Sequence, residues 1–504
     1  MNSKRVYQIV ALCSVVVYIG ALWNRFAVDD LPIIVQNPLV IHPSGIWRAF
    51  AAPYWPPDLG GHMYRPLVIA SFALDYLIDG KPWFHLVNLL WHAAVAVAVA
   101  ALTRRWSDDT TALVAGLLFA VHPVHVEAVA SVVGRAELLA ALFTVLAVYA
   151  ALVRESVGWC AAALALGMLS KENAAVAPGL IVWGWMLGFA RPDRRRIATF
   201  AGTWVGVLAV YAIVRAVVRH PYQGFESIAP MFVGESGLTV RITGVSALAD
   251  VARLLVFPLT LRVDYSPSER TAVTSFADPR FLAGLLCALL WGLVLVLAWK
   301  RGRKLEAFGL GWIGIAFLPV ANLVFPAGFY LAERTLYLPS VGLVIAVAAW
   351  LGRLPRHVLR PAVAAVVVAA AIRTAFRVPV WYNDAKVTDS IIADSPRSYV
   401  GQKRLIALYL DNRMPKEAAV AARVAASLYD RDATIYVTGS IAAFAAGEPK
   451  GADSLLAGLE RLCRGGCAGY YRHEAEVART HGYPEAADSL MARAARLPGA
   501  KVQP

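Results

Sequence analysis

The sequence predicts an all-α protein, with a polytopic membrane domain followed by a short tail of helical repeats. Three observations lead to this prediction. The 504 residues are 59% hydrophobic and only 16% charged, whereas soluble domains carry about 25% charged residues. Apolar runs recur up to about residue 380, and the polar tail repeats one pattern at intervals of 34 to 35 residues.

The apolar runs number eleven, and the first of them sets the topology. It extends from Val6 to Trp23, close to the ~20 residues that a membrane-crossing helix needs. Asn24, Arg25 and Phe26 follow it, and these do not form the small-residue site of a cleaved signal peptide. We therefore expect an uncleaved first span. The other runs are 83–103, 110–121, 136–153, 158–170, 174–190, 197–218, 281–299, 306–325, 337–352 and 359–378.

Lysine and arginine residues indicate the orientation, because short cytoplasmic connections of membrane proteins are enriched in them. They fall in every second connection, after the runs that end near 103, 153, 190, 299 and 352. A cytoplasmic N-terminus then places the tail outside. This pattern accounts for the net charge of +14 without nucleic-acid binding, and the Ala-, Arg- and Val-rich composition indicates a bacterial inner membrane with a periplasmic tail.

Two segments on the predicted outer side are long, at residues 24–82 and 219–280. Each contains an apolar stretch, 67–78 in the first and 248–261 in the second, that does not read as a clean span. We expect amphipathic helices on the outer membrane surface there.

The composition changes near residue 383, so we expect a membrane domain at 1–382 and a helical domain at 383–504. Similar segments begin at Pro415, Pro449 and Pro484. A period of 34 to 35 residues is typical of tetratricopeptide repeats, and about three copies are close to the minimum for a stable stack.

The tail also contains Cys463 and Cys467. If the tail is extracytoplasmic, the two cysteines either form a small disulfide or remain thiols.

The first candidate site residues are Asp29 and Asp30, which follow the first apolar run directly. The plain interpretation is a solvated loop or a helix N-cap. The alternative is a pair of carboxylates in a semi-enclosed site, where each raises the pKa of the other. One of them would then serve as a base for a hydroxyl group.

A second motif runs from His122 to Glu137. If residues 124–135 form one helix, Glu127 and Arg135 lie on the same face. They either brace a hairpin or present Arg135 to a phosphate. His122 and His125 would hydrogen-bond a substrate, and metal binding by these two histidines is the weaker alternative.

Two further turns place a cation beside an acid: Lys171 beside Glu172, and Arg334 beside Glu333. Self-neutralising pairs are the plain interpretation. Both turns face the same predicted side as Asp29, however, and a membrane-borne phosphodiester needs fixed cations near its leaving phosphate. Arginine suits bidentate phosphate contact and lysine a point charge.

Several segments resemble, in order along the chain, the transmembrane and tetratricopeptide-repeat-containing O-mannosyltransferases. The resemblance covers about residues 5–385, and repeats follow as they do in that family. The segments that carry it are Phe26–Asp30 with Asn37-Pro38, Tyr64–Leu67, Phe84–Asn88, His122-Pro123 with Val133–Glu137, Ser170–Glu172, Asp264–Ser266 and Ala332–Ser340.

The resemblance implies a GT-C-type glycosyltransferase, which takes a sugar, commonly mannose, from a polyprenyl- or dolichyl-phosphate lipid at the outer membrane face. The acceptor would be a Ser or Thr hydroxyl of a protein, no cofactor would be tightly bound, and a role for a divalent metal stays open. Asp29 or Asp30 would be the base, and the anomeric centre would be inverted. The implied phosphate-binding residues are Arg135, Lys171 and Arg334, and the implied supporting residues are Arg65, His122, His125, Glu127, Glu137, Glu172, Asp264, Tyr265, Glu333 and Tyr337.

Other interpretations of the same sequence are a GT-C transferase that acts on a lipid or polysaccharide, and a non-enzymatic membrane scaffold whose repeats recruit partners. A transporter is disfavoured, because the sequence contains no inverted repeat and no paired broken helices.

Overall fold

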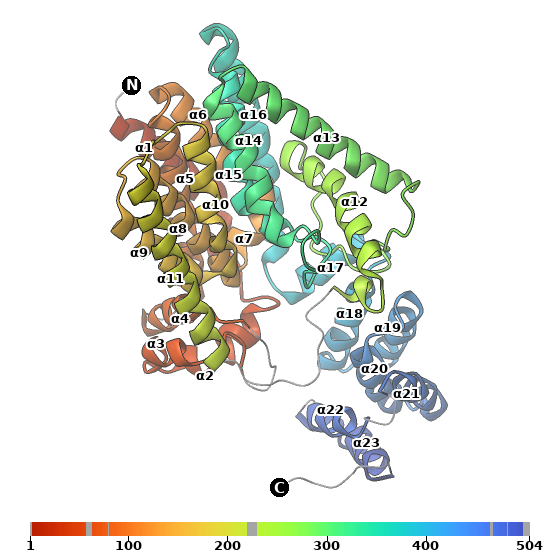
Figure 1. Cartoon of the computed structure of the whole chain (residues 1–504). Coiled ribbons are helices and arrows are strands. Elements are labelled where there is room, and N and C mark those ends of the chain that lie inside the picture. The colour runs from red at the N-terminus through yellow and green to blue at the C-terminus, as the bar shows by residue number, and fades with distance from the viewer. Residues whose placement is uncertain are drawn as a thin grey trace.

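The chain is all-helical over the part that its computed structural model describes, residues 3–56, 63–78, 80–218, 229–463, 467–480 and 482–496. Every regular element in these ranges is a helix, as expected from the sequence (Figure 1). Parts of both predicted outer segments, 57–62, 79 and 219–228, lie outside the described residues.

Seven helical segments of the described chain are long and apolar enough to cross a membrane. They are α1 (Ser3–Tyr18) continued by η1 (Ile19–Trp23), α5 (Lys81–Arg104), η5 (Val132–Gly134) continued by α8 (Arg135–Leu152), α11 (Arg194–Val218), α13 (Pro279–Lys300), η9 (Glu333–Leu336) continued by α15 (Tyr337–Leu351), and α16 (Arg356–Arg377) continued by η10 (Val378–Trp381).

The other four predicted spans are also helical but shorter. They are α6 (Asp109–Ala120), α9 (Val157–Ser170), η6 (Glu172–Val176) with α10 (Ala177–Met186), and α14 (Lys304–Phe317) with η8 (Leu318–Val320). The pair made by α6 with η4 (Pro123–His125) and α7 (Val126–Ala130) is bent by 48° and would count as an eighth span. The 14 residues of α9 rise about 21 Å, less than the ~30 Å hydrocarbon core. Length alone therefore supports seven or eight spans, not eleven.

The outer segments fold into helices of 3 to 20 residues. The first holds η2 (Leu31–Val35), α2 (Pro38–Ile41), α3 (Gly45–Arg48), η3 (Ala49–Ala51) and α4 (Pro66–Ile78), and the second holds η7 (Pro230–Phe232) and α12 (Gly237–Val256). The helix α12 begins earlier than the apolar stretch 248–261 indicated, because Ser236 caps it by accepting a hydrogen bond from the Thr239 N–H at 3.1 Å.

The tail forms one leading helix and three consecutive helix pairs. The helices are α17 (Asp384–Asp394), α18 (Tyr399–Asp411), α19 (Pro415–Leu428), α20 (Ala433–Ala445), α21 (Pro449–Cys463), α22 (Ala468–Thr480) and α23 (Pro484–Arg496). Each repeated proline is the first residue of the second helix of a pair, where its missing N–H costs nothing. Cys463 and Cys467 form a disulfide and are not free thiols.

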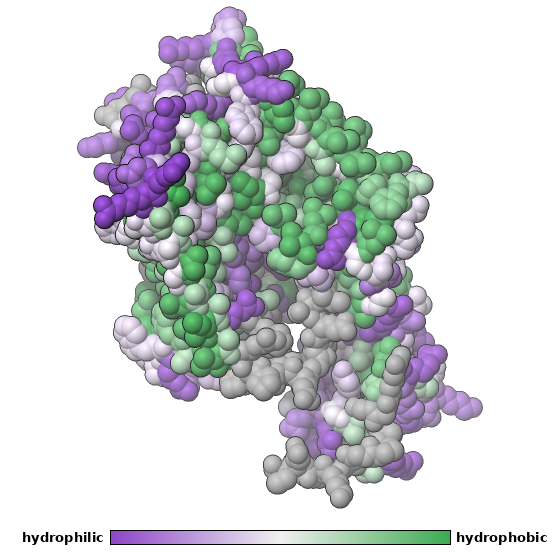
Figure 2. Space-filling model, in the orientation of Figure 1, coloured by the Kyte–Doolittle hydropathy of each residue, from purple (hydrophilic) through white to green (hydrophobic). Residues whose placement is uncertain are grey.

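Hydrophobic side chains cover the flank of the bundle, and polar side chains gather at the end that carries the N-terminus (Figure 2). The flank includes α13, which exposes Leu282, Leu286, Leu289 and Leu293. An apolar surface of this extent is typical of contact with lipid. The red helices α2–α4 and the blue tail lie at the end away from the N-terminus (Figure 1).

Candidate active site

Asp30 is buried and fixes the turn that follows the first long helix. Its Oδ2 accepts a hydrogen bond from the Ala27 N–H at 3.1 Å, and its Oδ1 accepts one from the Val133 N–H at 2.8 Å. Burial raises the pKa of Asp30 to about 7, and the neighbouring charge of Asp29 acts in the same direction. Asp30 therefore ties its own turn to the start of η5.

Asp29 differs from its neighbour because its side chain is only half-buried. Within the described residues, its carboxylate receives no hydrogen bond and forms no ion pair. Its main-chain oxygen accepts the Ile33 N–H at 3.1 Å, which holds the backbone in place. Of the two carboxylates, Asp29 is therefore the one whose oxygens are not engaged by other described groups.

Three cations around this turn each pair with an acid from a distant segment. Lys171 pairs with Glu137, and Arg334 pairs with Glu127. The Arg334 N–H also donates to the second Glu127 oxygen at 2.8 Å. The third pair joins Arg65 Nη2 to Glu172 Oε2 at 3.1 Å. Lys171 and Arg334 thus do form ion pairs, but with acids from other segments and not with the adjacent Glu172 and Glu333.

These groups act on one another as a single electrostatic cluster. The charge of Asp29 acts on the Arg334 guanidinium, as does that of Glu137. The Lys171 ammonium is in turn influenced by Arg65 and Arg334. Hydrogen bonds and ion pairs connect the three turns to neighbouring parts of one segment: Asp30 binds the Val133 N–H, Lys171 pairs with Glu137, and Arg334 pairs with Glu127.

The expected single helix over residues 124–135 does not form. The helix α7 ends at Ala130, Ser131 is extended (φ −78°, ψ 131°), and η5 then leads into α8. The Asn88 amide donates to the carbonyls of Ser131 and Val132 at 3.1 and 3.2 Å, which satisfies backbone oxygens that the break leaves outside a helix. Glu127 and Arg135 consequently face different partners.

Arg135 is fully buried, and its guanidinium is occupied by the protein itself. It pairs with Asp75 at 2.5 Å and donates to Asn88 Oδ1 at 2.8 Å and to the Phe84 carbonyl at 3.0 Å. It also lies over the Phe72 ring at 4.6 Å. These contacts make Arg135 hold α4, α5 and α8 together, and they engage the guanidinium that the sequence offered to a phosphate.

Glu333, Tyr265 and Asp264 connect elements around the cluster. Glu333 Oε1 accepts hydrogen bonds from the Arg262 N–H at 2.5 Å and from the Tyr265 hydroxyl at 3.0 Å. Asp264 Oδ2 accepts one from the Ser398 hydroxyl of the tail at 2.6 Å. The geometry gives these three predicted residues supporting contacts between the second outer segment, η9 and the tail.

The predicted histidines lie in the interior and are held by protein groups. His122 Nε2 lies 2.9 Å from the Leu255 carbonyl, and His125 Nε2 lies 2.7 Å from the Ser340 hydroxyl. The Tyr337 hydroxyl lies 2.8 Å from Nδ1 of His92. No group of three or more His, Cys, Asp or Glu side chains in the described ranges is arranged to hold a metal ion.

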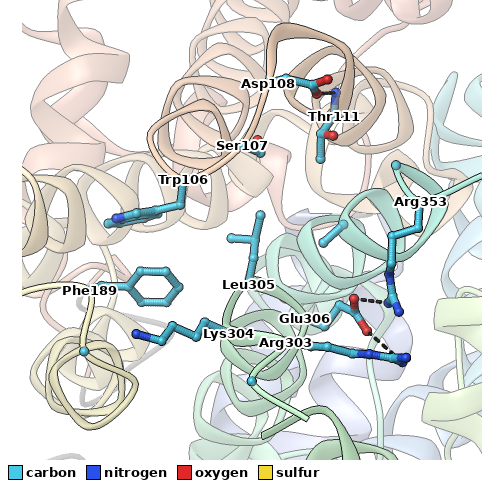
Figure 3. Close-up of a pocket in the computed structure, with 14 residues that line it drawn as sticks. Trp106, Ser107, Asp108, Thr111, Phe189, Arg303, Lys304, Leu305, Glu306 and Arg353 are labelled. Carbon is cyan, nitrogen blue, oxygen red and sulfur yellow. Dashed lines mark hydrogen bonds and ion pairs between the residues drawn. The ribbon is translucent and has the colours of Figure 1, made fainter.

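A pocket of about 660 Å³ lies at the opposite end of the bundle (Figure 3). None of the predicted site residues lines it. Arg303 and Arg353 both face the Glu306 carboxylate, and Lys304 extends along its wall. The helices α5, α13 and α15 end here, and cations complement the partial negative charge of helix C-termini. We assign this pocket no part in the chemistry.

Two acids that contact candidate site residues, or the turn that carries them, were not predicted from the sequence. Asp75 sits inside the apolar stretch 67–78, and an acid in such a stretch is itself a signal of a functional or paired group. Asp384, in the tail, accepts a hydrogen bond from the Val28 N–H beside Asp29. The two residues are far apart in the sequence, so no local sequence pattern predicts this contact.

The comparisons with known proteins agree with the resemblance. No protein-family model matches the chain. The protein O-mannosyl-transferase TMTC3 of Mus musculus is 30% identical over 395 residues, which cover 69% of this chain and 42% of the relative. The protein O-mannosyl-transferase TMTC4 of Homo sapiens is 28% identical over 458 residues, covering 77% and 61%. The chain is a homologue of the TMTC protein O-mannosyl-transferases.

The chain spans about half the length of these TMTC relatives, between 42% and 61% of each. ArnT from Cupriavidus metallidurans bound to undecaprenyl phosphate aligns with 98% of this chain and 75% of its own at 14% identity, with a TM-score of 0.40. AglB from Archaeoglobus fulgidus, in complex with an inhibitory peptide and a dolichol-phosphate, aligns with 84% and 59% at 16% identity and a TM-score of 0.40. A score at this level carries no argument about fold or function.

Proposed function

We propose that this chain is a membrane glycosyltransferase that moves a sugar from a polyprenyl-phosphate donor to Ser or Thr hydroxyls of proteins. The names of its TMTC relatives support mannose as the sugar and a protein as the acceptor. The observation that carries the proposal is the Asp29 carboxylate, which is unpaired among the described residues and lies within the electrostatic field of Arg334.

In the proposed reaction, Asp29 accepts the proton of the acceptor hydroxyl. The hydroxyl oxygen forms a bond to C1 of the sugar while the bond from C1 to the phosphate oxygen breaks, and the lipid phosphate leaves with that electron pair. Because attack and departure occur on opposite faces of C1, the anomeric configuration inverts. A phosphate needs little protonation to leave, so a single base suffices.

Lys171 and Arg334 are the cations that we assign to the leaving phosphate. Both lie in the cluster with Asp29, and fixed cations stabilise charge that develops in a transition state. Each is held in place by an acid from another segment, Glu137 for Lys171 and Glu127 for Arg334. Arg65 and Glu172 support the Lys171 turn, and Arg135 has a structural role.

We further propose a GT-C-type membrane domain at 1–382 with eleven spans, the short helices being spans that end in polar turns below the membrane surface. The tail at 383–504 would be a tetratricopeptide-type stack outside the cytoplasm, in the periplasm of a bacterium. The Cys463–Cys467 disulfide supports an oxidising compartment for the tail.

The test uses purified protein in detergent with radiolabelled polyprenyl-phosphate mannose and a Ser/Thr-containing peptide. We compare wild type with Asp29→Asn, and Asp389→Asn serves as the matched control because Asp389 is an exposed acid of α17. We expect wild type and the control to transfer label, and Asp29→Asn to bind the donor without transferring it.

Transfer by Asp29→Asn at the wild-type rate would refute the role of Asp29. If wild type binds the donor but labels only lipid or polysaccharide, the acceptor class is wrong. If it neither binds nor transfers any lipid-linked sugar, the chain is a scaffold.

A further inference from the structure

Val28, directly before Asp29, has an unusual backbone conformation. Its φ is +57°, in the left-handed region that β-branched residues rarely adopt. Backbone strain of this kind persists only where surrounding contacts hold it, and it is concentrated at functional sites. The position of the Asp29 carboxylate follows from this backbone, since the two residues share a peptide unit.

The contact that holds Val28 comes from the other end of the sequence. The Val28 N–H donates to Oδ1 of Asp384 at 2.6 Å. Asp384 is the first residue of α17, and Arg404 of α18 lies 3.5 Å from the same oxygen. Asn383 caps α17 by accepting the Lys386 N–H at 2.9 Å. The Asp384 side chain is therefore oriented by two helices of the tail.

Neighbouring residues repeat the same connection between the first turn and the tail junction. The Arg25 N–H donates to the Tyr382 carbonyl at 2.7 Å, and the Arg25 guanidinium lies 5.6 Å from the centre of the Tyr382 ring. Asn24 Nδ2 donates to the Val378 carbonyl at 3.4 Å. Residues 24–28 are thus attached to η10 and α17.

The turn is consequently held from two sides. Asp30 ties it to the start of η5 through the Val133 N–H, within the membrane domain. Asp384 ties it to the tail. The Asp29 carboxylate, between the two contacts, has no hydrogen-bond or ion-pair partner among the described residues. Loss of the Asp384 contact would leave residues 24 and 25 attached to the tail junction, but Val28 itself would lose its hydrogen bond to the tail.

We propose that Asp384 is a positioning residue for sugar transfer. By accepting the Val28 N–H, it keeps Val28 in the left-handed conformation that aims the Asp29 carboxylate. This rests on the proposed function of Asp29 as the base. The tail then sets the rate of transfer through α17, in addition to any role in holding an acceptor, while donor binding at Lys171 and Arg334 is independent of it.

The test compares Asp384→Ala, Asp384→Asn and the control Asp389→Ala on the same helix. We expect Asp384→Ala to lower kcat about tenfold, which corresponds to about 1.4 kcal/mol, with donor KM unchanged within about twofold. Asp384→Asn retains an acceptor oxygen and should recover most of this loss. The control should match wild type.

A second background separates positioning from a general structural role. Glycine adopts positive φ without strain, so the loss caused by Asp384→Ala should shrink to about threefold or less in a Val28→Gly protein. Hydrogen–deuterium exchange of peptides covering residues 24–31 should be faster in Asp384→Ala than in wild type and in Asp389→Ala.

The proposal is overturned if Asp384→Ala equals the control in kcat and in exchange. It is also overturned if its loss of kcat comes with an equal loss of donor binding and persists in the Val28→Gly background. If wild type transfers no lipid-linked sugar, the proposed function fails by itself. Exchange then decides whether Asp384 holds the turn, and unchanged exchange would refute that contact as well.

Discussion

Replacing Asp75 by Asn should destabilise the protein strongly, because it removes the counter-charge of a buried arginine. Arg135 is 0% exposed and Asp75 is 8% exposed in its side chain, and the two lie 2.5 Å apart. The Asp75 carboxylate also accepts a hydrogen bond from the Trp83 indole at 3.1 Å. After the substitution, the Arg135 guanidinium stays buried with only neutral partners.

Removing one partner of a buried ion pair typically costs about 3–5 kcal/mol, since the remaining charge is uncompensated. Replacing both partners by apolar residues of similar volume is often close to neutral. We therefore expect Asp75→Asn to lose about 3–5 kcal/mol, and Asp75→Leu combined with Arg135→Met to recover much of that loss. In Asp75→Asn, Arg135 keeps its hydrogen bonds to Asn88 and to the Phe84 carbonyl. These bonds partly stabilise the unpaired charge, which favours the lower end of the range of destabilisation.

The assay is thermal unfolding in detergent, followed by tryptophan fluorescence and by the fraction that stays monodisperse. Arg104→Met is the matched control, because Arg104 pairs with Asp109 at the same distance of 2.5 Å but is 41% exposed. Surface pairs contribute little, so this variant should unfold close to wild type. If Asp75→Asn is as stable as Arg104→Met, or if Arg135→Met folds normally but loses donor binding, the structural role assigned to Arg135 is wrong.

Three further predictions concern the site and the tail. The pKa of Asp30 is raised to about 7 in the folded protein, against about 3.9 in the unfolded chain. Its contribution to stability is therefore full below about pH 4 and is lost as the pH rises through 7. Asp30→Asn should abolish this pH dependence of the unfolding temperature between pH 5 and 8, and an unchanged pH dependence would contradict the assignment. Arg334→Ala should weaken donor binding, measured with a labelled polyprenyl phosphate, at least tenfold and more than Asp29→Asn does, whereas equal effects would remove Arg334 from the phosphate site. Deleting residues 433–504 keeps α17–α19 and should leave donor affinity within about twofold while reducing transfer to the natural protein acceptor; a parallel loss of donor binding would argue against separate roles.

The positions of the helices could be predicted from the sequence because hydrophobicity is a local property. Each of the eleven predicted runs is mostly helical, although 187–190 and 321–325 lie beyond the ends of α10 and η8. The lengths of the helices could not be predicted in the same way, since the length of α9 depends on where the polar turn at Lys171 begins. The break at Ser131 was likewise hidden, because it depends on Asn88 of another helix to satisfy its carbonyls.

The ion pairs among the candidate site residues could not be predicted from the sequence. Lys171 is adjacent to Glu172 in the sequence, yet it pairs with Glu137. Lys171 has an extended backbone, with φ −162° and ψ 143°, and successive side chains of an extended chain point to opposite sides. The distinction between Asp29 and Asp30 depends in the same way on a distant group, the Val133 N–H.

The hydrogen bond between Val28 and Asp384 joins residues 356 positions apart, which sets an order of events during biosynthesis. At about 5–20 residues per second, the ribosome makes Asp384 roughly 20–70 s after Val28. Until then the nascent chain holds its acidic turn at one side only. The turn that carries Asp29 therefore receives its contact with α17 only after almost the whole membrane domain has been made, and a polypeptide that stops before Asp384 lacks this contact.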